Sequence, residues 1–392
     1  MAVKRILVLS YFFPPDLSAG SFRADSIVRT LLERSHDCEV TVLTTEPNRY
    51  SSYVASNQAA FSDQRLTVVR VNVPNHSDSI YREIYGFLKY FACVLNYVRA
   101  KDFDVVFATS GRLMTAFLGR TVSWIKSVPI YLDIRDIFYE VVGDLFKGPK
   151  RLILLSAIKL VERFTFSNPD HVNLVSKGFS DYFSSNLSPF KMTFHTNGID
   201  EAFLPTGSVI QQVQQSGLIK IVYAGNIGDG QDLHRILPSL ANRLNEEVQF
   251  SVFGDGRKCK ELMKKLDEQK IMNVDVFSPV NREDLVQIYS DADVLFLHLG
   301  DKTAFKRVLP SKLFEYAASA KPILAGVGGY ASHFIQEEIK NAAVFPPNDT
   351  SAAVQALNSL KLENTDRSQF VKNFGRKRIS TKVADEIIDL CK

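Results

Sequence analysis

The sequence contains few of the groups that build metal sites or disulfide frameworks. Its four cysteines, Cys38, Cys93, Cys259 and Cys391, lie far apart and form no C-x-x-C pair. Neither a disulfide scaffold nor a structural zinc site is favoured, because both need cysteines at characteristic spacings. The histidines at positions 195, 234, 298 and 333 show no H-x3-H or H-E-x-x-H spacing. Asp291-Ala292-Asp293 fits D-x-D only formally, since it directly precedes an apolar run. We therefore expect a cytoplasmic protein without a metal.

Long apolar runs are also missing. Charged residues interrupt the best candidates, so no run of 18 or more uncharged apolar residues occurs, and we predict that the chain does not span a bilayer. The early apolar run Ile6–Phe13 follows Lys4 and Arg5, as in a signal peptide. It is short and ends at Pro14-Pro15-Asp16 without a small-residue cleavage site, so we interpret it as a buried strand.

The charge is nearly balanced, with a net value of +4. Residues 1–200 hold 23 basic and 19 acidic residues, whereas residues 201–392 hold 24 of each, so the excess lies in the first half. This excess is too small, and too poorly interleaved with aromatic residues, to indicate nucleic-acid binding. Contact between the first half and an anionic membrane remains open.

The 392 residues exceed what one hydrophobic core usually supports, so two domains are expected. Short β-branched apolar runs alternate with helical periodicity, which is typical of buried parallel strands in α/β domains. The first series of predicted strands is 5–9, 39–43, 66–71, 105–108, 130–132 and 171–175, and the second is 219–223, 248–253, 274–277, 294–298, 323–325 and 343–345. A Pro/Gly/Gln-rich stretch between Phe203 and Gly217 separates the two series. We therefore predict domains at residues 1–203 and 204–375, followed by a helix at 376–392 that packs back on the first domain.

One predicted helix, from Ile80 to Arg99, is apolar on two sides. Tyr81, Ile84, Tyr85, Leu88, Phe91, Ala92, Leu95 and Val98 form a face with a period of 3.6, which we assign to the core. A second stripe, Phe87, Tyr90, Val94 and Tyr97, lies among basic residues and resembles a helix at a lipid interface. The alternative is a helix that is buried on both sides.

Ligands of open α/β sheets bind beyond the carboxyl ends of the strands, so the loops that follow the strands are informative. The first loop is long and lacks the G-x-G-x-x-G pattern, which disfavours a dehydrogenase. It ends at Gly20 and Ser21, where a helix start could meet a phosphate or where the glycine could serve an ordinary turn. In the second domain, Gly225-Asn226-Ile227-Gly228-Asp229-Gly230-Gln231 could form a nest of amides or a plain turn.

A third segment, Pro310-Ser311-Lys312-Leu313-Phe314-Glu315, predicts a helix start with Ser311 as its cap. Glu315 could accept hydrogen bonds from two ribose hydroxyls, while Lys312 and free amides meet a diphosphate. The alternative is a surface pair between Lys312 and Glu315.

Taken together, these segments resemble glycosyltransferase family 4, the retaining enzymes of GT-B fold, over nearly the whole chain. The other motifs that carry the resemblance are Asn197-Gly198-Ile199-Asp200, Gly254 within Phe253-Gly254-Asp255-Gly256, and Leu313 to Ala318 with Lys321-Pro322. The resemblance implies two Rossmann-like domains that face each other across a cleft. Arg135-Asp136, Pro310-Ser311-Lys312 and Gly326 to Tyr330 further resemble bacterial transferases of L-N-acetylfucosamine in O-antigen or capsule assembly.

The resemblance also implies roles for individual residues. Glu315 matches the second glutamate of the family's E-x7-E motif, which holds the ribose, and Arg307 takes the place of the first. Because that first glutamate would touch the hydroxyls of the donor sugar, its replacement favours a deoxy or acetamido sugar over a plain hexose. Asn226 and Gln231 replace an Arg/Lys pair of the family, so the phosphate charge would have to be met by Lys312, Arg307, Lys306 or backbone amides. Arg135 and Asp136 stand where the family has a histidine, and Asp136 is our candidate for contacting the acceptor hydroxyl; a structural Arg135–Asp136 pair is the alternative.

We therefore expect a metal-independent hexosyltransferase that uses a UDP-sugar and a glycan or polyprenyl-diphosphate-linked acceptor. The predicted catalytic residues are Asp136, Arg135 and Lys312; the predicted donor site comprises Gly20, Ser21, Gly225, Asn226, Gln231, Gly254, Arg307, Ser311, Lys312, Leu313 and Glu315, with Asn197, Gly198 and His298 elsewhere in the cleft. The enzyme would act in the cytoplasm or at the cytoplasmic face of the inner membrane. A UDP-sugar 2-epimerase and a noncatalytic donor-binding partner are the alternatives.

Overall fold

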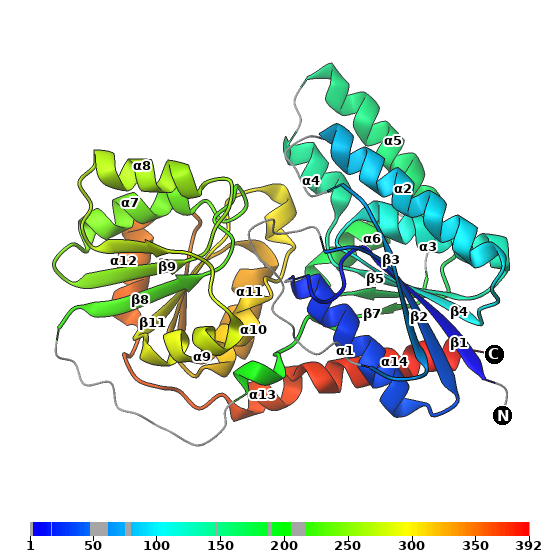
Figure 1. Ribbon diagram of the computed structural model, residues 1–392. Coiled ribbons are helices and arrows are strands. Elements are labelled where there is room, and N and C mark those ends of the chain that lie inside the picture. Colours follow the sequence, from blue (N-terminus) through cyan, green and yellow to red (C-terminus); the bar gives the residue numbers. More distant parts are fainter. Residues whose placement is uncertain are drawn as a thin grey trace. The chain divides into compact units, whose positions relative to one another are not determined.

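The computed structural model describes residues 3–16, 18–47, 62–74, 80–145, 148–186, 190–204 and 217–391. The chain forms two compact domains, residues 1–197 with 376–392, and residues 198–375 (Figure 1). It leaves the first domain between Asn197 and Gly198 and returns at Arg376, whereas the sequence placed the first crossing at residue 203. Most of the predicted boundary stretch, residues 205–216, lies outside the described residues.

The first domain is built on a seven-stranded parallel sheet in the order β3-β2-β1-β4-β5-β6-β7. Its strands are β1 (Lys4–Ser10), β2 (Cys38–Thr45), β3 (Leu66–Val71), β4 (Val105–Ser110), β5 (Ile130–Ile134), β6 (His171–Leu174) and β7 (Met192–Thr193). Its helices are α1 (Ala19–Arg34), α2 (Ile80–Arg99), α3 (Leu113–Lys126), α4 (Phe138–Leu145), α5 (Pro149–Thr165), α6 (Ser180–Asn186) and α14 (Arg376–Leu390), with the short helix η1 (Lys177–Phe179). Only β7 has no counterpart among the predicted strands.

The second domain is built on a six-stranded parallel sheet in the order β10-β9-β8-β11-β12-β13. Its strands are β8 (Ile219–Ala224), β9 (Val248–Phe253), β10 (Val274–Phe277), β11 (Val294–His298), β12 (Ile323–Gly326) and β13 (Ala342–Phe345). Its helices are α7 (Leu233–Arg243), α8 (Cys259–Glu268), α9 (Arg282–Asp291), α10 (Lys312–Ala318), α11 (Gly329–Glu338), α12 (Thr350–Ser359) and α13 (Ser368–Phe374), with the short helices η2 (Glu201–Phe203) and η3 (Thr303–Lys306). The predicted class, two parallel α/β sheets in tandem, is confirmed.

Helix α2 has the predicted bounds, but its two faces were largely assigned the wrong way round, since of the predicted core face only Val98 is buried. Phe87, Tyr90 and Val94 are buried, whereas Tyr81 and Tyr85, placed in the core by periodicity, are exposed. Both stripes are apolar, so the period alone could not rank them. The hydroxyl of the buried Tyr90 donates to the Leu43 carbonyl 2.7 Å away. This hydrogen bond satisfies the hydroxyl and allows the stripe that carries Tyr90 to face inward.

The last helix, α14, belongs to the first domain. Its residues Val383, Ala384 and Ile387 join the core formed by β1, β2 and α1. Polar contacts fix it along α1, including a 2.8 Å hydrogen bond between the Ser26 and Ser380 hydroxyls and the ion pair of Arg34 with Asp385. The C-terminal segment therefore completes a domain whose other residues precede residue 198.

Candidate active site

The strand order reverses once in each sheet, between β1 and β4 and between β8 and β11. Open parallel sheets bind ligands outside the carboxyl ends of their strands at such points. The predicted site residues follow these ends: Gly20 comes after β1, Arg135 and Asp136 after β5, and Gly225 after β8, while His298 ends β11. Each domain thus carries one part of the predicted site at the expected edge.

In the first domain, Arg135 lies against the start of α1. A Cβ atom built on Gly20 would lie 2.1 Å from Arg135 Nη1, so the guanidinium contacts the glycine backbone. Ser18 caps the helix, because its Oγ accepts from the Ser21 amide at 3.1 Å. The Ser21 amide is therefore engaged in the cap. An anion at this helix start would therefore meet the positive charge of Arg135 beside Gly20, which adds to the effect of the helix dipole.

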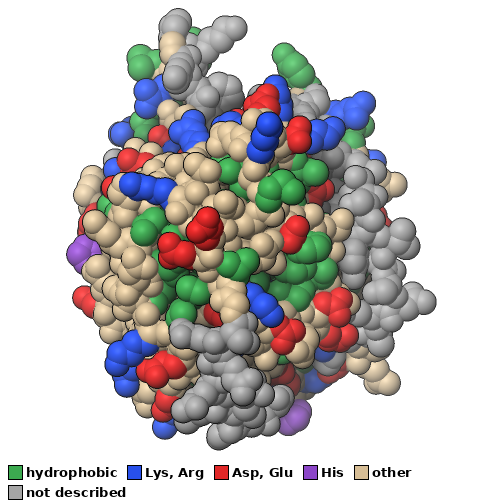
Figure 2. Space-filling model, turned by 90° about the vertical axis from the view of Figure 1, so that its left-hand side faces the viewer, with side chains coloured by type: hydrophobic (Ala, Val, Ile, Leu, Met, Phe, Trp, Pro, Cys, Tyr) green, Lys and Arg blue, Asp and Glu red, His purple; other side chains and the backbone are tan. Residues whose placement is uncertain are grey.

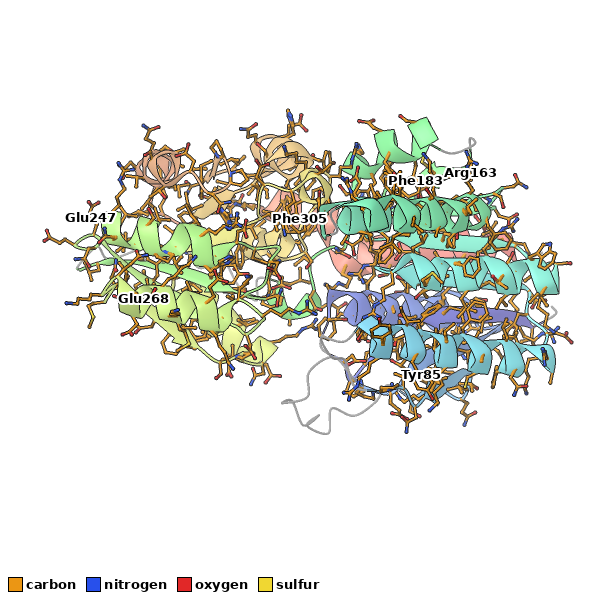
Figure 3. The ribbon with its side chains drawn as sticks, turned by 90° about the horizontal axis from the view of Figure 1, so that it is seen from above. Tyr85, Arg163, Phe183, Glu247, Glu268 and Phe305 are labelled. Atoms are coloured by element: carbon orange, nitrogen blue, oxygen red, sulfur yellow. The ribbon has the colours of Figure 1, made fainter. Side chains whose placement is uncertain are left out.

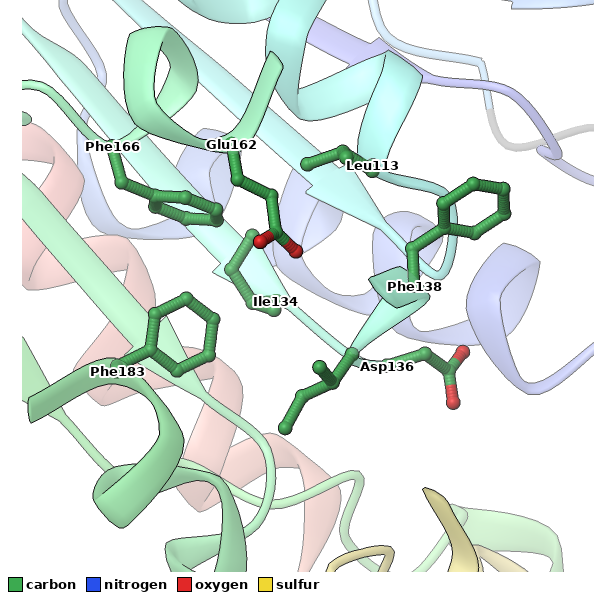
Figure 4. A pocket seen from close by; sticks show the side chains of 8 residues that line it. Leu113, Ile134, Asp136, Phe138, Glu162, Phe166 and Phe183 are labelled. Carbon is green, nitrogen blue, oxygen red and sulfur yellow. The ribbon is translucent and has the colours of Figure 1, made fainter. Parts of the chain in front are cut away.

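Asp136 lies on the next loop and is exposed. A Cβ atom on Gly111, which follows β4, would lie 2.9 Å from Asp136 Oδ2, so the carboxylate sits against that glycine. Asp136 also lines a small pocket with an otherwise largely apolar wall (Figure 4). The lining residues are Leu113, Ile134, Asp136, Ile137, Phe138, Glu162, Phe166 and Phe183.

Glu162 is a polar residue of this pocket that the sequence reasoning did not single out. Its carboxylate points into the pocket in Figure 4, and it accepts a hydrogen bond from the Tyr182 hydroxyl at 2.6 Å. Burial raises the pKa of Glu162 above its ordinary value. The signal was present in the sequence, because Glu162 continues the buried stripe of Leu155 and Ile158 along α5.

Arg112 is a second residue that the sequence reasoning missed. Its guanidinium lies 4.6 Å from the Tyr11 ring centroid and 5.3 Å from that of Phe12. Its Nη1 is 3.0 Å from Glu83 Oε2 on α2. Arg112 thus connects the β4–α3 loop to the two aromatic rings of the β1–α1 loop and to α2.

The two other predicted residues near this edge, Asn197 and Gly198, lie where the chain leaves the first domain. Asn197 is buried, and its carbonyl accepts from Arg376 Nε at 3.3 Å. Gly198 has φ of +72°, a left-handed conformation that favours glycine. The amide of the following residue, Ile199, donates to the Phe374 carbonyl at 2.8 Å, so the outgoing and returning segments run together.

In the second domain, the loops after β8 and β9 touch at two glycines. A Cβ atom on Gly254 would lie 1.8 Å from the Gly225 carbonyl oxygen, which no side chain could tolerate without movement of the backbone. The Gly225 amide donates to Phe253 at 2.9 Å, and the Ile227 amide donates to Asp255 at 2.9 Å. The parallel ladder therefore continues past the strand ends and holds the glycine-rich turn in place.

Asn226 and Gln231 are brought together across that turn. Asn226 Nδ2 donates to Gln231 Oε1 at 2.9 Å, and the Gln231 carbonyl accepts from His298 Nδ1 at 2.7 Å. His298 is fully buried, and its Nε2 accepts from the Asn348 amide at 3.1 Å. Burial lowers the pKa of His298 to about 4, so its ring is neutral and bonded on both sides. It positions the turn and has no exposed surface of its own.

The Lys312 segment forms a compact polar group. Lys312 Nζ lies 3.0 Å from Glu315 Oε2 and 3.4 Å from the Tyr289 hydroxyl, which itself lies 3.5 Å from Glu315. The Lys312–Glu315 pair considered as the alternative is thus formed. The Glu315 side chain is only 14% exposed, however, and Tyr289 is buried, so the pair is not an ordinary surface pair.

The neighbours of Lys312 serve mainly to build α10. Ser311 precedes the helix in a helical conformation, and its side chain makes no capping hydrogen bond. The Leu313 side chain is fully buried, and its amide donates to the Pro310 carbonyl at 3.1 Å. Arg307 directly follows η3. The carbonyl of Lys306, the last residue of η3, contacts Gly329: a Cβ atom built on this glycine would lie 2.0 Å from the Lys306 carbonyl oxygen. The segment thus offers Lys312, Arg307 and Glu315 as its polar groups.

Comparison with known proteins identifies the class. The sequence model of the family described as Glycosyl transferases group 1 matches residues 210–378. Sucrose-phosphate synthase from Thermosynechococcus elongatus is similar over 99% of both chains, with 14% identity and a TM-score of 0.74. Anabaena HepE in complex with UDP and glucose matches 98% of this chain and 100% of its own, with 13% identity and a TM-score of 0.68. The chain is a glycosyltransferase of the GT-B fold.

A further structural relative of this glycosyltransferase is WaaG, a glycosyltransferase involved in lipopolysaccharide biosynthesis. The similarity covers 97% of this chain and 95% of the WaaG chain, with 16% identity and a TM-score of 0.59. No curated protein sequence matches the chain. The family match falls almost entirely on the second domain, which carries Lys312 and Glu315.

The described residues of this glycosyltransferase hold neither a candidate metal cluster nor a helix suited to span a membrane. Among these residues, no three His, Cys, Asp or Glu side chains gather as they would around a metal ion. Within the same part of the chain, no helix has the length and apolar character needed to cross a membrane.

Proposed function

We propose that this glycosyltransferase moves a sugar, with retention of anomeric configuration, from a UDP-sugar to a glycan or polyprenyl-diphosphate-linked acceptor. The observation that carries the proposal is the Lys312–Glu315–Tyr289 group in the second domain. Glu315 is a largely buried carboxylate with acceptor capacity for two vicinal hydroxyls, and Lys312 beside it supplies a cation for phosphate oxygens. HepE, which has the same fold, was solved with UDP and glucose.

The chemistry follows from the charges that develop. As the anomeric bond stretches, positive charge grows on the sugar ring and negative charge on the leaving UDP. Lys312 and Arg307 would stabilise the departing diphosphate, while the ordered turn at Gly225 lets backbone groups approach it closely. In the first domain, Asp136 would hold the acceptor hydroxyl, and Arg135 beside Gly20 would offer a further cation. In this proposal no step requires a metal.

We further propose a deoxy or acetamido hexose, such as L-N-acetylfucosamine, as the sugar, and bacterial surface polysaccharide, O-antigen or capsule, as the product. Arg307 in place of a carboxylate favours such a donor, because a glutamate there would accept hydrogen bonds from the hydroxyls of a plain hexose. WaaG, another GT-B relative, is involved in lipopolysaccharide biosynthesis. The reaction would take place in the cytoplasm, at the cytoplasmic face of the inner membrane.

The test has two stages. UDP-sugars are first screened for protection of the protein against thermal unfolding, with UDP and ADP as references; we expect protection by UDP and by at least one acetamido or deoxy sugar nucleotide. The protecting donor is then incubated with lipid-linked glycans, and the release of UDP is measured. Release that depends on the acceptor supports transfer. Conversion of the donor without an acceptor would instead show an epimerase, and binding without any turnover would show a noncatalytic partner.

A further inference from the structure

Three helices lie together on one face of the first domain. Helix α3 contacts both α2 and α5, and the Phe117 ring on α3 joins them. Its centroid lies 6.0 Å from that of Phe91 on α2 and 5.4 Å from that of Phe164 on α5. Figure 3 views these helices from above, with Tyr85 on α2 and Arg163 on α5 labelled. We call the outward side chains of α2, α3 and α5 the three-helix face.

Large apolar side chains are exposed on all three helices. Tyr81 is 85% exposed, Leu152 is 74% exposed, and Trp124 is 67% exposed. The full set is Tyr81, Ile84, Tyr85 and Leu88 on α2, Trp124 and Ile125 on α3, and Leu152, Ile153, Leu160 and Phe164 on α5. Single exposed apolar residues are common on soluble proteins, but a set that spans three adjacent helices marks an interaction surface.

The charged side chains of this face are predominantly basic. Its described basic residues are Arg82, Lys89, Arg99, Arg120, Lys126, Arg151, Lys159 and Arg163. Its only acidic residues among the described side chains are Glu83 and Glu162. Glu83 pairs with Arg112 at 3.0 Å, and Glu162 is buried and bonded to Tyr182. By contrast, acidic and basic groups are interspersed on the surface drawn in Figure 2.

We propose that the three-helix face rests on the surface of a bilayer that contains anionic lipids. Apolar and aromatic side chains would enter the boundary between headgroups and acyl chains, where Tyr and Trp are favoured. Each lysine or arginine near an anionic leaflet adds electrostatic attraction. A symmetric dimer through the same face would place like charges opposite each other, so the charge pattern favours the lipid over a second copy.

This inference deepens the proposed function, because it names the surface on which a lipid-linked acceptor would be met. The Asp136 pocket shares two of the three helices, since α3 provides Leu113 and α5 provides Glu162. Docking through this face would therefore bring lipid close to the elements that build the proposed acceptor pocket.

The test uses the full chain and its own fluorophore, since Trp124 is the only tryptophan. Vesicles of phosphatidylcholine with phosphatidylglycerol are titrated into the protein and compared with vesicles of phosphatidylcholine alone. We expect a blue shift of the Trp124 emission and co-sedimentation with the anionic vesicles, both reduced by salt. Emission that stays unchanged, with all protein in the supernatant, overturns the proposal, as does self-association that leaves no lipid binding.

Two variants and a matched control test whether lipid binding occurs through the three-helix face. Tyr81→Ser with Tyr85→Ser, and Leu152→Ser with Ile153→Ser, should each lower the vesicle partition coefficient at least tenfold. Met263→Ser with Met272→Ser changes two exposed apolar residues of the second domain and should leave it unchanged. Equal loss in the control would overturn the assignment. UDP protection, measured without vesicles, shows that each variant is folded and keeps a failure of membrane binding separate from a failure of donor binding.

Discussion

The Arg23 guanidinium grips both carboxylate oxygens of Asp133 in the centre of the first domain. Nη2 lies 2.8 Å from Oδ1 and Nε lies 2.9 Å from Oδ2, and neither residue is appreciably exposed. Burial alone would raise the pKa of Asp133, but the Arg23 charge, together with hydrogen bonds from Arg23, Asn173 and Thr109, more than offsets this, and the pKa is lowered. Arg23 also donates to the carbonyls of His195 and Thr196, so the pair anchors the segment that leads out of the domain.

Replacing Asp133 by alanine should therefore destabilise the first domain by about 3–5 kcal/mol, because the Arg23 charge would be left buried and unpaired. The measurement is the unfolding free energy from guanidinium titration. Asp25→Ala is the matched control: it removes a carboxylate from the half-buried, solvent-accessible Asp25–Arg29 pair on α1, the helix of Arg23, so its cost should be at most about 1 kcal/mol. If Asp133→Ala and Asp25→Ala lowered the unfolding free energy equally, the large cost expected for leaving Arg23 buried and unpaired would be contradicted.

The second prediction concerns the nucleotide. Glu315→Gln should weaken UDP binding by about 10- to 100-fold, because a hydrogen bond to a charged carboxylate contributes about 1.5–3 kcal/mol. Calorimetric titration with UDP measures the change. Glu337→Gln removes an exposed carboxylate from α11 and should leave the affinity as it is. Wild-type affinity in Glu315→Gln would remove Glu315 from the donor site.

The third prediction tests the contact between the glycine loops. Gly254→Ala should destabilise the second domain by about 1–3 kcal/mol and weaken UDP binding, because the new methyl group overlaps the Gly225 carbonyl. Gly328→Ala is the control, since its nearest neighbour, Pro347 Cδ, is 3.9 Å away. Thermal unfolding with and without UDP separates the two effects. A stable Gly254→Ala protein with normal UDP protection would show that the loops are not held as described.

The fourth prediction concerns acid. Burial lowers the pKa values of His171 and His298 to about 4, against about 6.5 in an unfolded chain. Between these values the unfolded state binds more protons, so stability should fall as the pH drops from about 6.5 to 4, by up to about 1.4 kcal/mol per pH unit for each histidine. Glu386, whose pKa is lowered by hydrogen bonds from His195 and Tyr131 against the effect of burial, adds a loss at still lower pH.

Guanidinium midpoints at several pH values between 7.5 and 4 measure this slope. His171→Gln should reduce this dependence of stability on pH, because one titrating group is removed. His333→Gln, which changes an exposed residue of α11, should leave the dependence as it is. A midpoint that rises toward pH 5 would contradict the assignment of neutral, buried rings.

The strands could be predicted because buried parallel strands are continuous β-branched runs whose ends are marked by turn residues. Gly20 and Gly225 were singled out because they follow predicted strands, and Glu315 because it falls in the first turn of a predicted helix; the match of Glu315 to the ribose-binding glutamate came from the family resemblance. The faces of α2 could not be predicted, since both are apolar and only the reach of Tyr90 to Leu43 separates them.

Side-chain contacts between residues far apart in the chain could not be predicted from the sequence either. The Glu386 carboxylate lies 2.9 Å from His195 Nε2, although 191 residues separate them. Arg23 and Asp133 are 110 residues apart, and neither stands in a recognisable motif. Such contacts depend on how helices pack on the sheet, which local spacing does not encode.

The last prediction separates the roles of the two domains. Asp136 lies in the first domain, exposed beside Gly111 at the end of β4, whereas Lys312, Arg307 and Glu315, the side chains proposed for the diphosphate and the ribose, lie in the second. Asp136→Asn keeps the size of the side chain and removes its charge, so UDP affinity should stay within about twofold of wild type. Transfer to the acceptor should fall by about 10²- to 10⁴-fold if the carboxylate accepts the hydroxyl proton. Asp181→Asn, an exposed change on α6, is the control and should transfer normally. If Asp136→Asn turned over at the wild-type rate, the acceptor hydroxyl would have to be held by another group, and Glu162 in the same pocket would be the residue to test next.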